Sequence, residues 1–96
     1  MRIEQQLNDI TDRLARLRRE MEIASEQLTF QKEVVDDSKT RMLVSETPLA
    51  DREYREARDD LRRLEKYYEE CRLELDELTK IQDRLLDRLL ARAARR

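Results

Sequence analysis

Adjacent acidic side chains are the groups in this sequence best suited to acid–base chemistry, and they occur as Asp36-Asp37, Asp59-Asp60 and Glu69-Glu70. Two carboxylates act as general acid and general base when a pocket separates their pKa values. On solvated faces of helices, where we place these pairs, no such pocket exists. The chain also contains no histidine and no glycine, which excludes histidine-based catalysis and glycine-rich phosphate loops. We therefore expect no enzymatic activity and no cofactor.

The single cysteine, Cys71, has no second cysteine with which to form an internal disulfide. No residues around it have the spacing of a metal-binding motif. We interpret Cys71 as a small buried hydrophobic residue, with a redox role as the alternative.

The composition favours long helices. Charged residues make up 46% of the 96 residues, aromatic residues only 4%, and there is a single proline. The net charge of −2 gives no strong attraction to nucleic acid or to an anionic membrane. There is no run of roughly 18 apolar residues that would span a bilayer, and the N-terminal segment lacks the apolar stretch of a signal peptide. A cytoplasmic location is expected.

Apolar residues recur at alternating spacings of four and three, as the core positions of a coiled coil do. The first series runs through Ile3, Leu7, Ile10, Leu14, Leu17, Met21, Ala24, Leu28, Gln31, Val35, Ser38 and Met42. The second runs through Ala50, Tyr54, Ala57, Leu61, Leu64, Tyr68, Cys71, Leu75, Leu78, Gln82, Leu85 and Leu89.

Pro48 separates the two series. Inside a helix it would cost about 3 kcal/mol, but it is well tolerated at the first helical position, and Thr47 before it is a good N-cap. The sequence therefore predicts a helix over about 2–44, a turn at 45–47 and a second helix over about 48–93.

The two series match each other when the chain folds back on itself. In an antiparallel hairpin, two residues that face each other have sequence numbers that add up to the same value along the whole hairpin. With a sum of 92, every residue of the first series faces a residue of the second. The same register brings Arg13 close to Glu74 and Arg41 close to Glu53. We predict an all-α fold of one domain, residues 1–96: two long helices forming an antiparallel coiled-coil hairpin. Two such hairpins would pair into a four-helix dimer.

A self-association surface is expected halfway along the hairpin. Four residues there lie outside the core positions but on one side of the hairpin: Ile23, Phe30, Val34 and Tyr67. A lone hairpin would leave this apolar patch in water, so we predict a homodimer. The alternative is that the four side chains only broaden the contact between the two helices.

The turn is unusually apolar for a surface loop. Leu43, Val44 and Leu49 lie off the core positions, with Glu46 and Asp51 close by. Since turns are usually polar, this tip is a candidate contact for a protein partner. Alternatively, the apolar side chains fold back and staple the helices together.

The C-terminal segment is basic and also apolar. Its arginines, which we consider for contact with an anion such as phosphate, are Arg84, Arg88, Arg92, Arg95 and Arg96. The apolar residues Ile81, Leu86, Leu90 and Ala93 lie among them. No aromatic side chains interleave the arginines as stacking platforms, so nucleic acid binding is not expected. The alternative is that the arginines only complement the helix dipole.

The stretch Glu53-Tyr54-Arg55-Glu56-Ala57-Arg58 just after the turn resembles the stretch Glu-Tyr-x-x-Ala followed by Lys or Arg in Gre-type transcript-cleavage factors. That family inserts a coiled-coil hairpin into RNA polymerase and presents acidic residues at its tip. The tip here is Ser45-Glu46-Thr47-Pro48, where the family carries a Gly-Asp-Leu element and an acidic pair. The resemblance implies a transcription regulator that inserts its tip into RNA polymerase.

Two functions are therefore carried forward. The first is a non-catalytic coiled-coil protein–protein interaction module, an adaptor or structural unit that self-associates and binds an unidentified protein. The second is the regulator that inserts its hairpin tip into a large enzyme such as RNA polymerase.

Overall fold

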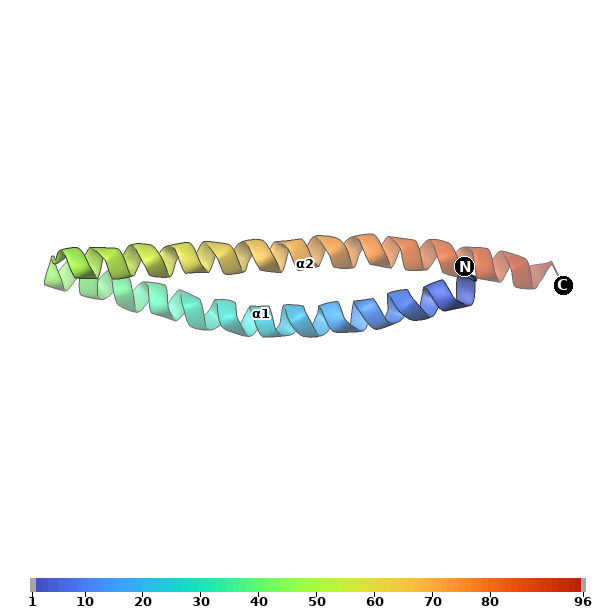
Figure 1. Ribbon diagram of the computed structural model, residues 1–96, viewed down its shortest axis with the longest axis horizontal. Helices are drawn as coiled ribbons and strands as arrows, with labels where there is room; N and C mark the ends of the chain where they lie inside the picture. The colour runs from blue at the N-terminus through green and yellow to red at the C-terminus, as the bar shows by residue number, and fades with distance from the viewer. Residues whose placement is uncertain (1, 96) are drawn as a thin grey trace. The chain divides into compact units, whose positions relative to one another are not determined.

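The computed structural model describes residues 2–95, which form two helices, α1 (Ile3–Ser45) and α2 (Pro48–Ala94). The two helices pack against each other in opposite directions (Figure 1), and the described residues contain no strand. The predicted antiparallel helical hairpin is thus confirmed. Pairing of two hairpins into a dimer stays a prediction.

The turn is built by a left-handed residue followed directly by a capped helix. Glu46 has a φ of 50° and donates its N–H to the Met42 carbonyl at 3.1 Å, which closes the last turn of α1. Thr47 then acts as N-cap, because its Oγ1 accepts the N–H of Ala50 at 3.1 Å. Pro48 occupies the first helical position, where its missing N–H leaves no helical hydrogen bond unmade.

The chain divides into two compact units. We call residues 2–21 with 70–95 the open half, and residues 22–69 the turn half. Every core position of the heptad pattern is buried or half-buried in its own half, and none is exposed. The register predicted from the sequence therefore places the expected side chains between the helices.

Large apolar side chains fill the contact between the helices in the open half. Leu14 and Leu17 are each only 1% exposed, and Cys71 and Leu85 are also buried. Beside this contact, Arg13 donates two hydrogen bonds to the Glu74 carboxylate, at 2.7 and 3.0 Å. The predicted meeting of these two charged residues is confirmed.

Small and polar side chains fill the corresponding contact in the turn half. Its buried residues are Ala24, Ser38, Ala50 and Ala57. The Ser38 hydroxyl donates to the Val34 carbonyl at 2.8 Å within its own helix. The larger core side chains of this half, among them Leu28, Leu61 and Leu64, are half-buried.

Candidate protein interaction surfaces

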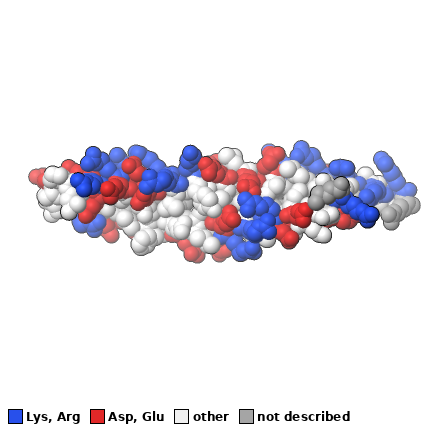
Figure 2. All heavy atoms as spheres, in the orientation of Figure 1, with Lys and Arg blue, Asp and Glu red and all other residues white. Residues whose placement is uncertain are grey.

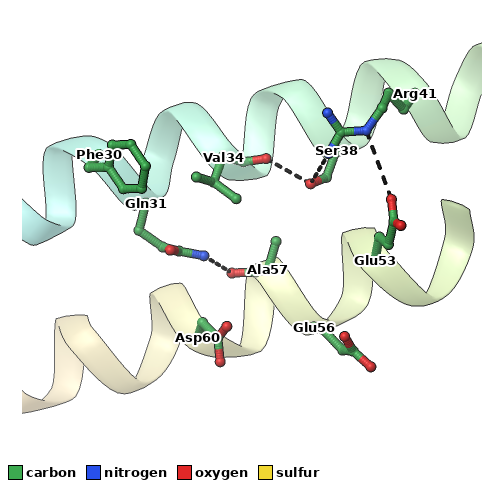
Figure 3. Close-up of a pocket in the computed structure, with 9 residues that line it drawn as sticks. All are labelled: Phe30, Gln31, Val34, Ser38, Arg41, Glu53, Glu56, Ala57 and Asp60. Carbon is green, nitrogen blue, oxygen red and sulfur yellow. Dashed lines mark hydrogen bonds and ion pairs between the residues drawn. The ribbon is translucent and has the colours of Figure 1, made fainter.

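A shallow groove runs between the helices in the turn half, with a volume of about 690 Å³. Figure 3 shows its lining residues, which we call the Phe30 groove: Phe30, Gln31, Val34, Ser38 and Arg41 from α1, and Glu53, Glu56, Ala57 and Asp60 from α2. A second hollow of about 450 Å³ adjoins it, because Phe30 and Gln31 line both; its other residues are Glu26, Gln27 and Leu64.

The groove exists because of the small residues at the core positions beneath it. Ser38 and Ala57 leave space between the helix backbones that leucines would fill. Gln31 spans this space and donates its Nε2 hydrogen to the Ala57 carbonyl at 2.9 Å (Figure 3). Phe30 stands beside the groove with 65% of its surface exposed, while Val34 is half-buried.

The two walls of the groove differ in charge. The α2 wall carries three carboxylates, those of Glu53, Glu56 and Asp60, whereas Arg41 is the single cation lining the groove. Arg41 and Glu53 form an ion pair with 3.9 Å between Nε and Oε2, as the sequence predicted. Asp60 is paired with Arg63 along its own helix. The α1 wall thus combines the apolar Phe30 and Val34 with polar residues and Arg41, whereas the α2 wall is acidic.

The structure brings only part of the predicted self-association surface together. Phe30 and Val34 line the groove, whereas Ile23 and Tyr67 do not. Ile23 is 57% exposed and Tyr67 43% exposed. Val34 is half-buried and so widens the contact between the two helices, as the alternative expected. Ile23 and Phe30 are mostly exposed and do not.

The tip of the turn exposes its apolar side chains. Leu43 is 64%, Val44 79% and Leu49 60% exposed, so these side chains do not fold back over the helices as a staple. Glu46 and Asp51 are exposed beside them. Together they form an apolar knob with acidic neighbours.

Only some of the arginines near the end of α2 come together, and one of these is already paired with a carboxylate. Arg92 is paired with Glu4, and Arg88, Arg92 and Arg95 line a depression of about 300 Å³. The pKa of the Glu4 carboxyl lies below its usual range, because backbone hydrogen bonding in the first turn of α1 and the nearby Arg92 both favour its charged form. Arg84 is exposed and lies outside this depression, and Arg96 lies outside the described residues.

Exposed leucines accompany this basic segment. Leu86 is 41% and Leu90 67% exposed. In the view of Figure 2, charged side chains of both signs lie along the molecule, and basic ones are present at the end of α2 as well as over the turn half. Leu73, 53% exposed, was missed by the sequence reasoning. Leu73 lies midway between two core residues in the sequence and therefore on the outer face of α2. This position could have indicated that it is exposed.

Of the adjacent acidic residues, Asp60 lines the Phe30 groove, which is shallow and open to solvent. Asp59 forms an ion pair with Arg62 at 3.3 Å, one turn along α2. Cys71 is buried and unpaired. Among residues 2–95, no three His, Cys, Asp or Glu side chains are grouped to hold a metal ion, and neither described helix is apolar enough over its length to cross a membrane.

Comparison with protein-family models, with curated proteins and with solved structures found no match to this chain. Its function has to be inferred from its own surfaces. Three of these are distinct: the Phe30 groove, the apolar tip and the basic end of α2.

Proposed function

We propose that this chain is a non-catalytic protein–protein interaction module that self-associates through the face of its turn half. The observation that carries this proposal is the exposure of Phe30, which keeps 65% of its surface in water at the edge of a groove. It is the only phenylalanine of the sequence. Aromatic side chains at such positions supply much of the binding energy of protein interfaces.

The distribution of exposed apolar side chains favours the turn half as a whole, including both the Phe30 groove and the tip. In the described chain, the turn half exposes six large apolar residues and the open half three. The six are Ile23, Phe30, Leu43, Val44, Leu49 and Tyr67. Exposed apolar clusters rimmed by charge are typical of interaction sites, so the turn half is the part of the molecule suited to binding.

Light scattering on a sizing column, over a range of protein concentrations, tests this proposal. We expect the wild type to elute with a multiple of the 11.7 kDa chain mass. A Phe30→Glu, Tyr67→Glu variant should elute as a single chain, because two carboxylates would be buried without partners in the interface.

The matched control is Leu73→Glu, which places the same charge on an exposed leucine of the open half. This variant should associate as the wild type does. A wild type that stays a single chain at every concentration, or a control that dissociates as fully as the double variant, would contradict the proposal. Circular dichroism on all three proteins reports whether the helices remain folded.

Insertion of the tip into RNA polymerase is the second candidate function, and the exposure of Leu43, Val44 and Leu49 favours it. The resemblance to Gre-type factors suggests the enzyme. Fluorescence anisotropy with purified RNA polymerase core enzyme measures this binding. Substitution of Glu46 and Asp51 by alanine should abolish it while leaving self-association unchanged. Equal binding of the wild type and the variant would exclude an acidic tip contact.

A further inference from the structure

We infer that the Phe30 groove binds the arginine-rich end of α2, residues 84–95, from a second copy of this chain. The inference rests on the self-association proposed above and adds to it the identity of the bound segment. The contact is head-to-tail: one copy supplies the groove of its turn half, and the other supplies the end of its open half.

Charge argues against the simpler alternative, in which two grooves face each other across a twofold axis. With the twofold axis running across the helices, that arrangement would bring the acidic α2 walls of both copies together, with Glu53, Glu56 and Asp60 repeated on each side. Like charges placed opposite one another at an interface are unfavourable. With the axis along the helices, each α2 wall would face the partner copy's α1 wall, where Arg41 is the single cation of the lining. A basic surface is the better complement to this groove.

The sequence divides its charge in the matching way. Residues 22–69 contain 13 acidic and nine basic side chains, a net charge of −4, whereas the remaining residues contain 10 acidic and 12 basic side chains, a net charge of +2. Residues 84–96 hold five arginines and a single acid, Asp87. The most basic segment and the acidic groove thus belong to different halves.

The end of α2 also has the right distribution of side chains around its axis. Leu86, Leu90 and Ala93 follow one another at helical spacing and form an apolar row. The arginines Arg84, Arg88, Arg92 and Arg95 form a second row, in which Arg92 is already paired with Glu4 of its own copy. Between the two rows lie the small exposed residues Ala91 and Ala94, which allow close approach to another helix, and, one turn before Ala91, the exposed Asp87.

The two rows correspond to the two walls of the groove. With the alanines facing the groove floor, the leucine row lies toward Phe30 and Val34 on α1. The arginine row then lies toward Glu56 and Asp60 on α2, and long arginine stems can cover apolar surface while their charged ends reach the carboxylates.

The lengths also agree. The groove and the hollow beside it extend along α2 from Glu53 to Leu64, or about 16 Å at the rise of an α-helix. Residues 84–94 of the second copy span about 15 Å on the same measure. Since every copy has one groove and one basic end, the contact leads to open chains or closed rings of copies.

Two variants, each lacking one of the two surfaces, test the inference by complementation. Phe30→Glu disables the groove, and Leu86→Glu with Leu90→Glu disables the end of α2. Each variant alone should elute as a single chain. An equimolar mixture should form a complex of two chains and no larger species, because the mixture contains one intact groove and one intact end. Raising the salt concentration should weaken that complex at least about 10-fold, as expected for ion pairs at a surface.

The outcomes separate the inference from the proposed function. If the α2-end variant associates as the wild type does while the groove variant is a single chain, self-association stands and the head-to-tail contact is overturned. If both variants are single chains and their mixture gives no complex, the head-to-tail contact is also overturned. If the wild type itself never associates, the proposed self-association fails and this inference fails with it. Circular dichroism of each variant confirms that the helices are intact.

Discussion

The two halves of the hairpin place their apolar side chains in opposite ways. In the open half, leucines fill the contact between the helices, and Leu14 and Leu17 are almost fully buried. In the turn half, alanines and Ser38 are the buried residues of the same contact, the larger core side chains are only half-buried, and Phe30 and Ile23 remain in water. The open half thus buries large apolar side chains between its helices, whereas the turn half leaves several of them exposed to solvent.

This difference assigns different roles to the two halves. Burial of large side chains is the main source of stability in a helical pair, so the open half is expected to hold the hairpin together. The turn half contributes less to folding but has a groove that leucines at Ser38 and Ala57 would have filled. The proposed binding surface thus lies where packing within the chain is less complete.

The largest expected effect comes from Leu14→Ala in the open half. Removal of a fully buried leucine side chain leaves a cavity and should lower the free energy of unfolding by about 2–5 kcal/mol. Phe30→Ala in the turn half should change it by less than about 0.5 kcal/mol when measured on the single chain, because the ring is largely exposed. Urea unfolding followed by circular dichroism measures both, and similar losses from the two variants would refute the assigned roles.

Gln31→Leu should stabilise the turn half. The variant loses the hydrogen bond to the Ala57 carbonyl, but that oxygen retains its helical partner, so no buried group is left unsatisfied. The added apolar burial should raise the free energy of unfolding by about 1 kcal/mol. Gln31→Ala serves as the control that removes the amide without filling the space. A Leu variant no more stable than the Ala variant would show that the groove floor cannot accept a larger side chain.

Glu46→Gly should stabilise the turn by a smaller amount. A residue with a side chain is disfavoured at the φ of 50° that Glu46 adopts, and glycine is the usual choice there. Because glycine also makes the unfolded chain more flexible, we expect a net gain of only about 0.5 kcal/mol. Glu46→Ala, which cannot relieve the strain, is the comparison in the same urea experiment. A glycine variant less stable than the alanine variant would contradict this account.

The smallest effect concerns the Arg13–Glu74 pair of the open half. The hydrogen bonds from Arg13 lower the pKa of the Glu74 carboxyl, and Glu74 in turn raises the pKa of Arg13. A carboxyl with a lowered pKa stabilises the fold above its unfolded pKa of about 4.3, and this contribution is lost as the pH falls through the lower folded value. Because both side chains are more than a third exposed, the contribution is small.

Glu74→Gln isolates this contribution. The difference between the urea midpoints of wild type and variant should be positive at pH 7 and should shrink toward zero as the pH falls below the pKa of Glu74. Other carboxyls titrate in both proteins and cancel in the difference. A difference that does not change with pH would show that the pair acts only through its hydrogen-bond geometry.

Much of the fold followed from the spacing of residue types. The heptad pattern identified the side chains between the helices, and Pro48 after Thr47 located the turn to within a residue. The constant sum of paired numbers set the register, which the Arg13–Glu74 and Arg41–Glu53 contacts confirm. The physical reason is that helix periodicity is local and a single reversal leaves one way to align the two apolar stripes.

The candidate surfaces followed from the sequence only in part. It identified Phe30 as lying off the core positions, but it did not indicate the groove, because that space depends on how closely the two backbones approach above Ser38 and Ala57. It left open whether Leu43, Val44 and Leu49 cover the turn or face the solvent, and the structure exposes them. It did not identify Leu73, which shares no face with the other apolar residues that drew attention.

By itself, then, the sequence determined that this chain is an antiparallel pair of helices, because spacing and one proline are properties of the chain read residue by residue. Only the tertiary structure decided where the pair is well packed and where it is hollow. Packing depends on the joint volume of side chains from both helices at each level. The leucines of the open half close that space, and the small and polar residues of the turn half leave it open beside Phe30.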